Sequence, residues 1–168
     1  FPLFARWTTY FDCKEETNWW YIIKDSEYIP EQLPSKKRYY IRKGRENFQT
    51  SIINPKQYAK EITNICFDAW QDYSSQYRPN FVPDLFEKDI LSGSYDKYTV
   101  WGSFNKKTNE LCGFLVSFTN NCCIYLIQLK VLRTAEKDKV NFALIDSFLN
   151  HFNNLLSGGN YYIENNER

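Results

Sequence analysis

The second half of the chain constrains the fold most, because three strand patterns and a helix pattern follow one another with short connections. The stretches "YTVWGSF" (98–104) and "LCGFLVSF" (111–118) flank the loop "NKKTN", which predicts a β-hairpin. The stretch "CCIYLIQLKVL" (122–132) is nearly all apolar, as is typical of a central strand. A polar loop at 133–139 then leads to apolar residues at helical spacing over 140–156. This half therefore predicts three antiparallel strands followed by a helix.

The first half adds strands and helices on both sides of a basic segment. The stretches "WWYIIK" (19–24) and "FQTSII" (48–53) are rich in aromatic and β-branched residues and predict strands. Asn54 as the cap and Pro55 as the first helical residue predict a helix over 55–73. A shorter helix at 84–91 and a last strand at 161–163 complete the prediction.

These elements predict a single domain over residues 1–168, the size of one ordinary domain. Residues 1–47 hold the first strand and the basic helix, and residues 48–168 form a β-α-α-β-β-β-α-β core. We expect a mixed α/β fold with a largely antiparallel sheet and helices on both of its faces.

Charge is concentrated in one place. The chain carries a net charge of only +1, but six cations and no acid fall between Lys36 and Arg45. We expect a helix there that begins near Ser35 and ends at Gly44. Its three arginines form one stripe: Arg38, Arg42 and Arg45. The adjoining stripe, with Ile41 and Phe48, is expected to dock on the sheet.

The apolar runs and the counts of cysteine, histidine and methionine limit which cell compartment and which kinds of site to expect. No apolar run reaches the roughly 18 residues of a membrane-spanning helix, and no signal peptide is recognisable. The five cysteines show no Cys-x-x-Cys spacing, and the odd count favours reduced thiols in the cytoplasm. With one histidine and no ligand cluster, no metal site is expected. The chain begins at Phe1 and contains no methionine, so we expect a piece of a longer product.

The predicted order resembles the core of the GNAT acyltransferase fold. In that family an acyl donor lies between the fourth and fifth strands, and the helix after the fourth strand points its N-terminus at the donor's pyrophosphate. The matching parts here are the strand at 122–132, the loop at 133–139 and the helix at 140–156.

The upstream unit is similar to the Fem-type aminoacyltransferases of peptidoglycan bridges and their bacterial GNAT-like relatives, which carry a basic "K-x-R-x-x-I-x-K-(A/G)" helix. The matching residues are Lys36, Arg38, Ile41, Lys43 and Gly44. The stretch "ELCGFLV" (110–116) is similar to their "G-K-L-V-G" strand. The resemblance covers most of residues 19–163.

The chain departs from the GNAT pattern in two ways. The family's (R/Q)-x-x-G-x-(G/A) motif has small residues where this chain has Val140 and Phe142, which would obstruct a phosphate. Fem-type enzymes use aminoacyl-tRNA in place of CoA, so the resemblance leaves acyl-CoA and aminoacyl-tRNA as donors. The chain also stops before the family's last helix and two strands, so we expect a fold truncated at its C-terminus.

Candidate catalytic residues lie on the two strands that flank the expected cleft. They are Tyr125 and Gln128 on the central strand and Tyr161 and Glu164 on the last one, where Tyr162 is an equal alternative to Tyr161 as the acid. A transfer to an amine needs a proton acceptor, donors for the carbonyl oxygen and an acid for the leaving group. In a regular strand Tyr125 and Gln128 would face opposite sides. Packing within the sheet is the alternative role for all four.

Cations near the loop-to-helix junction and on the basic helix are candidates for donor phosphates. They are Arg38, Arg42, Arg45, Arg133, Lys137 and Lys139, with Asn141 at the start of the helix. The alternative is a solvated basic face that balances the acidic remainder of the chain.

The resemblance implies an acyl- or aminoacyltransferase that acts on an amine of a cell-envelope or sugar precursor, with a small-molecule or lipid-linked acceptor. Two alternatives stay open: a non-catalytic GNAT-like binding or assembly module, and an RNA-binding module that takes tRNA through the Arg38 stripe. The exposed edge of a truncated sheet also predicts a homodimer.

Overall fold

Six strands form one sheet in the computed structural model, which describes residues 22–71 and 80–165. The strands are β1 (Ile22–Lys24), β2 (Phe48–Ile53), β3 (Thr99–Asn105), β4 (Leu111–Asn120), β5 (Cys123–Val131) and β6 (Tyr162–Asn165). The helices are α1 (Ser35–Asn47), α2 (Ala59–Gln71), α3 (Pro83–Ser92), α4 (Arg133–Glu136) and α5 (Val140–Ser157).

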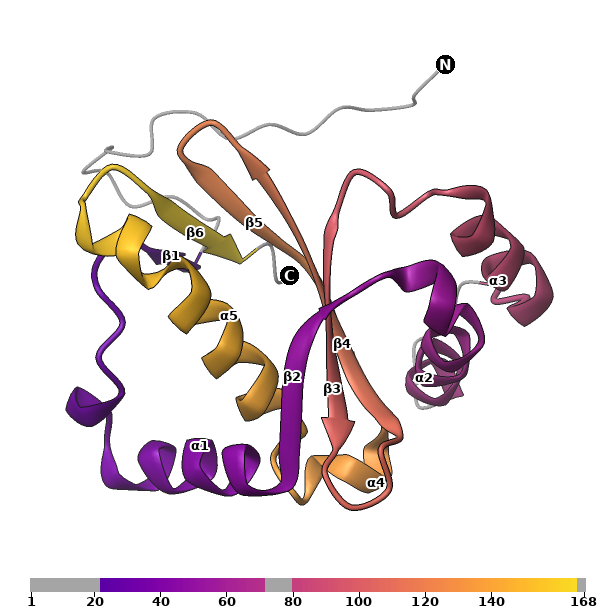
Figure 1. Cartoon of the computed structure of the whole chain (residues 1–168), viewed down its shortest axis with the longest axis horizontal. Helices are drawn as coiled ribbons and strands as arrows, with labels where there is room; N and C mark the ends of the chain where they lie inside the picture. Colours follow the sequence, from indigo (N-terminus) through magenta and orange to yellow (C-terminus); the bar gives the residue numbers. More distant parts are fainter. Residues whose placement is uncertain (1–21, 72–79, 166–168) are drawn as a thin grey trace.

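The strands lie in the order β1-β6-β5-β4-β3-β2 (Figure 1). Neighbouring strands are antiparallel except β5 and β6, which are parallel because α5 connects them as a crossover helix. Figure 1 shows α5 on one side of the sheet and α2 and α3 on the other. The predicted fold class, a mixed and largely antiparallel sheet with helices on both faces, is confirmed.

Each face of the sheet has its own apolar core. On one face, α5 packs Leu144, Phe148 and Leu156 against Trp101 and Leu115. The opposite face is covered by α2 and α3 and contains a separate set of buried residues, among them Ile62, Ile65, Ile90, Val100, Phe114 and Val116. Alternate residues of β3 and β4 therefore belong to different cores, as the period of two in a strand requires.

The boundaries of the basic helix differ from the prediction. Pro34 is the N-cap in place of Ser35, and α1 continues through Gly44 to Asn47. The helix continues because Gly44 lies against α5, where its missing side chain permits close contact. A Cβ at Gly44 would lie 2.8 Å from the carbonyl oxygen of Lys139. The docking stripe is confirmed, since Ile41 and Phe48 are both buried.

Other boundaries need smaller corrections. The side chain of Asn54 accepts a hydrogen bond from the Lys56 amide, as a cap should, but residues 55–58 form a 3₁₀ turn before α2. The predicted loop at 133–139 contains the short helix α4. The predicted strand at 19–24 is seen as β1, and its residues 19–21 lie outside the described part, as does Tyr73 of the predicted 55–73 helix.

The sheet edge that we expected to be open near the C-terminus is partly covered. Strand β1 pairs with β6 through three residue pairs, from Ile22↔Asn165 to Lys24↔Ile163. The outer strands of the described sheet are therefore β1 and β2. In the ranges 22–71 and 80–165, no helix combines the length and the apolar character that crossing a bilayer requires.

Candidate functional site

A β-bulge in β5 brings two of the predicted catalytic residues onto the same face of the sheet. Val116 of β4 pairs with Gln128, but the next residue, Ser117, pairs with Leu126, so Ile127 is the extra residue. Tyr125 pairs with Phe118, which lies two residues from Val116 and so on the same face of β4. The strand is not regular here, so Tyr125 and Gln128 share a face, whereas a regular strand would have put them on opposite sides.

The amide of Gln128 is held by two neighbours on the α2 and α3 side. The Tyr95 hydroxyl donates to Gln128 Oε1 at 3.2 Å, and Gln128 Nε2 donates to Cys66 Sγ at 3.9 Å. Burial raises the pKa of Cys66 to about 12, and burial also raises the pKa of Tyr95. Both groups are therefore protonated at neutral pH.

Four polar side chains meet where β5 and β6 pair. The parallel register places Cys123 beside Tyr162 and Tyr125 beside Glu164, on the face opposite α5. We call Cys123, Tyr125, Tyr162 and Glu164 the β5–β6 cluster. Glu164 is only 2% exposed, and the Cys123 thiol donates to its Oε2 at 3.9 Å. Tyr125 and Tyr162 are partly exposed, so the cluster has a carboxylate beneath two accessible phenols.

The environment of the cluster keeps its phenols and thiol protonated. The hydrogen bond with Cys123 and burial raise the pKa of Tyr125 to about 12. Burial and the hydrogen bond with the same thiol raise the pKa of Tyr162 to about 12. Burial raises the pKa of Cys123, and the charge of Glu164 adds to this effect. At neutral pH the phenols are therefore hydrogen-bond donors.

The position of Tyr161 corrects the predicted set of catalytic residues. It packs against the apolar core under α5, on the face opposite Tyr162 and Glu164. Because strand residues alternate between faces, Glu164 shares its face with Tyr162 and not with Tyr161. The alternation itself was available in the sequence, since Ile163 is apolar and its two neighbours are polar.

Aromatic rings connect the Gln128 region with the β5–β6 cluster. The ring centroids of Tyr95 and Tyr98 lie 6.1 Å apart, those of Tyr98 and Phe118 6.0 Å, and those of Phe118 and Tyr125 6.5 Å. The line of rings runs along one face of the sheet. Sequence reasoning missed Tyr95 and Cys123 because their roles depend on contacts with distant strands.

The first turn of α5, where the resemblance would place a donor pyrophosphate, is covered by α1. Val140 is fully buried, and the Phe142 ring packs on Tyr40 with centroids 5.1 Å apart. Lys43 donates to the carbonyl of Lys137 at 3.0 Å, and a Cβ at Gly44 would lie 3.0 Å from the amide nitrogen of Ala143. A CoA pyrophosphate therefore does not fit the family's usual position.

The other predicted phosphate ligands near this junction have different surroundings. Lys137 is exposed, while Lys139 has a left-handed backbone (φ 72°) and places its ammonium 4.6 Å from the Tyr40 ring centroid. The Asn141 side chain accepts a hydrogen bond from the Phe142 amide. The two lysines are thus near the surface, and Asn141 acts locally at the start of α5.

The arginine stripe of α1 is divided by its contacts. Arg38 donates to the backbone carbonyl of Glu31, and Arg42 pairs with Glu46 at 3.8 Å on the surface. Arg45 instead makes two hydrogen bonds to the buried carboxylate of Asp146, at 2.7 and 2.8 Å. The three arginines therefore have three different partners in the fold.

Arg133 is joined to α2. Its backbone amide and its guanidinium donate to the two carboxylate oxygens of Asp68 at 3.0–3.2 Å. Burial would raise the pKa of Asp68, but the hydrogen bonds and charge of Arg133 outweigh it and lower that pKa. This pair joins the start of α4 to α2.

Metal ligands do not gather in the described ranges: no group of three or more His, Cys, Asp or Glu side chains there could hold a metal ion. The four cysteines that lie in these ranges are free thiols: Cys66, Cys112, Cys122 and Cys123.

No protein-family model and no curated protein match the sequence. Solved structures do: L-PGS from Bacillus licheniformis has a TM-score of 0.53 at 12% identity, over 86% of this chain and 46% of that chain. A conserved protein of unknown function from Bacteroides thetaiotaomicron has a TM-score of 0.54 at 12% identity, over 86% of this chain and 52% of that chain. This chain spans about half the length of both proteins. At these identities the likeness is one of fold.

Proposed function

We propose that this domain transfers an acyl or aminoacyl group to an amine, and that the β5–β6 cluster is where the reaction occurs. The observation that carries this proposal is the bulge at Ile127 together with the parallel register of β5 and β6. They place Tyr125, Gln128 and Glu164 on one face, next to Tyr162. The confirmed fold class and the resemblance to acyltransferases support the same reaction.

The proposed roles follow from the positions of these groups and from the raised pKa of Tyr162. Glu164 accepts a proton from the attacking amine, whose nitrogen forms a bond to the carbonyl carbon of the donor. Tyr162, which is protonated at neutral pH, gives its proton to the leaving oxygen or sulfur as the bond to the carbonyl carbon breaks. The proton then returns from Glu164 to Tyr162, so the net change is a proton moved from the amine to the leaving group. Tyr125 is the second phenol that orients the donor.

The donor that fits best is an aminoacyl ester such as aminoacyl-tRNA. Acyl-CoA is disfavoured because α1 covers the first turn of α5. An ester donor on RNA needs no pyrophosphate site, and its chain of phosphates suits surface cations outside the β5–β6 cluster. The surface candidates are Arg38, Arg42, Lys137 and Lys139. Arg45 and Arg133 have carboxylate partners within the fold.

The acceptor class comes from the resemblance: an amine on a cell-envelope or sugar precursor, either a small molecule or lipid-linked. The Fem-type relationship and a homodimer through a sheet edge are parts of the same proposal. For the homodimer, β2 is an outer strand, and its Ile52 is 52% exposed.

The experiment compares two donors and two adjacent tyrosines. Total tRNA charged with radiolabelled amino acids, or radiolabelled acetyl-CoA, is incubated with the protein and glucosamine as the amine. We expect transfer from charged tRNA, with Glu164→Gln and Tyr162→Phe slowing it about 10²-fold or more. Tyr161→Phe is the matched control and should leave the rate unchanged. Equal losses in Tyr161→Phe and Tyr162→Phe would contradict the assigned site.

A non-catalytic module is the second candidate, and the covered first turn of α5 is the observation that favours it. It predicts no transfer from either donor. If charged and uncharged tRNA bind with the same steep salt dependence, yet no amine is acylated, the RNA-binding alternative would be favoured.

A further inference from the structure

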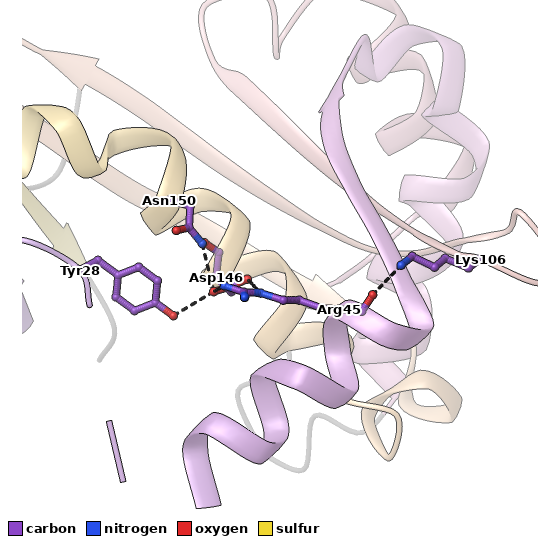
Figure 2. A network of polar contacts seen from close by, with 5 residues as sticks. All are labelled: Tyr28, Arg45, Lys106, Asp146 and Asn150. Carbon is purple, nitrogen blue, oxygen red and sulfur yellow. Dashed lines mark hydrogen bonds and ion pairs between the residues drawn. The ribbon is translucent and has the colours of Figure 1, made fainter. Parts of the chain in front are cut away.

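A buried carboxylate of α5 joins two consecutive segments from the first part of the chain to a helix more than 100 positions later. Asp146, whose side chain is 4% exposed, lies in the middle of α5. Figure 2 shows Tyr28, Arg45 and Asn150 pointing toward it. Its Oδ1 accepts hydrogen bonds from the Tyr28 hydroxyl at 3.0 Å, Arg45 Nη2 at 2.8 Å and Asn150 Nδ2 at 3.1 Å. We call these four residues the Asp146 cluster.

The first arm of the cluster holds residues 25–34, which connect β1 to α1 and which we call the strap. Tyr28 is the buried aromatic residue of the strap, at 7% exposure. Its backbone amide donates to Asn153 Oδ1 at 2.6 Å, and its carbonyl accepts from Asn153 Nδ2 at 3.1 Å. One side-chain amide of α5 thus satisfies both backbone groups of Tyr28, as a neighbouring strand would.

The strap matters for β6 because β1 is short. Only three residue pairs join β1 to β6, and one of them places Ile23 beside Glu164. A pairing of this length is marginal alone, so the attachment of Tyr28 to α5 supports it.

The second arm holds α1 on α5. Arg45 lies in the last turn of α1 and makes the bidentate pair with Asp146, the strongest geometry for an arginine and a carboxylate. Lys106 of the β3–β4 turn donates to the Arg45 carbonyl at 2.6 Å (Figure 2). The same helix places Gly44 against the first turn of α5.

We propose that the Asp146 cluster is a conformational latch that couples the strap to α1, so that releasing one loosens the other. The two arms share the Oδ1 atom of Asp146. The Tyr28 hydroxyl and Arg45 Nη2 both donate to this atom, and the Asp146 side chain is 4% exposed although that of Arg45 is 53% exposed. Hydrogen bonds to a carboxylate are stronger where water is excluded from it. The latch thereby links the β1–β6 pairing beside Glu164 with the α1 cover over the first turn of α5.

Hydrogen exchange of the whole chain, read by mass spectrometry in three peptides, tests the coupling. The peptides cover residues 22–34, residues 35–47 and the β3–β4 hairpin at 99–120, which reports global unfolding. We expect Tyr28→Ala to speed exchange about tenfold both in the strap and in α1, and to leave the hairpin unchanged. Arg45→Gln should do the same from the other arm.

Matched controls keep the result specific. Asn153→Ala, which removes the amide that binds the Tyr28 backbone, should reproduce the pattern of Tyr28→Ala, whereas Asn154→Ala on the exposed side of α5 should not. Arg42→Gln, which breaks only a surface pair, is the control for Arg45→Gln.

Faster exchange confined to the strap in Tyr28→Ala would show two independent contacts and overturn the proposal. A uniform increase that includes the hairpin would show a general loss of stability and would also overturn it. Tyr28→Phe, which keeps the ring, should give a smaller change in the same two peptides.

Discussion

Gln128 and Tyr125 lie on one face of β5 because the strand contains one residue more than its partner between them. Ile127 is that residue, and its side chain is 46% exposed. The bulge aims the Gln128 amide at Tyr95 and Cys66 on the α2 and α3 side. Bulges commonly redirect a side chain beside a functional site, and this one aligns an amide with two phenols and a carboxylate.

Gln128→Leu should lower the free energy of unfolding by about 1–3 kcal/mol, because the partly buried Tyr95 hydroxyl loses its acceptor. Urea denaturation followed by circular dichroism measures this. Gln57→Leu, at an exposed position, is the control and should change stability by about 0.5 kcal/mol or less. An equal effect of both substitutions would mean that the amide has no structural role in the face.

Gly44→Ala should destabilise the protein by about 1–3 kcal/mol, although replacing a helical glycine by alanine usually stabilises by about 0.5–1 kcal/mol. The reason is that the new Cβ would lie 2.8 Å from the Lys139 carbonyl oxygen, and both groups are held by packed helices. Gly158→Ala is the control, since a Cβ there meets only ordinary contacts at 3.5 Å or more. Thermal unfolding of both variants checks the prediction. A stabilised Gly44→Ala variant would show that α1 can move away from α5 easily.

The pair of Asp68 and Arg133 should make stability depend on pH in the acid range. The folded state lowers the pKa of Asp68 below its ordinary value of 3.8, so the pair stabilises the fold above that pH. The stabilisation is lost as the pH falls through the lower pKa of the folded state. Asp68→Asn should therefore be less stable than the parent at pH 7 by about 0.5–1.5 kcal/mol, since the pair is partly exposed.

That difference should shrink as the pH is lowered below 3.8, and urea titrations at several pH values would measure it. Asp25→Asn, at an exposed position, is the control. A gap between parent and Asp68→Asn that stays constant down to the lowest pH would show that charge is not its origin.

The adjacent thiols Cys122 and Cys123 should differ strongly in reactivity. Cys122 is exposed, whereas Cys123 is buried beside Glu164, and burial raises its pKa. Since the thiolate is the reactive species, iodoacetamide at pH 8 should alkylate Cys122 about tenfold faster or more, as fragment-ion mass spectrometry can show. In denaturant the two rates should converge. Equal rates in the folded protein would mean that Cys123 is not shielded from solvent.

Local patterns in the sequence were sufficient for the order of the elements and for the fold class. The apolar run of β5, the Asn54 cap and the Ile41 and Phe48 stripe depend on residues that are neighbours in the chain, so their spacing alone predicts them. Glu164 and Tyr125 are candidates because the resemblance places the cleft between the two strands that carry them.

The tertiary structure decided which of these groups meet. The bulge at Ile127 results from the pairing of β5 with β4, and no local pattern encodes it. In the sequence, Arg45 is one cation of a stripe. In the structure it binds Asp146 of α5, which lies more than 100 positions further along the chain. The sequence predicts that the helix ends at Gly44, but the same packing shows that Gly44 is a contact site with α5. Hydrogen bonds and close contacts between distant segments set these positions, because each one forms only when both partners are held by the fold.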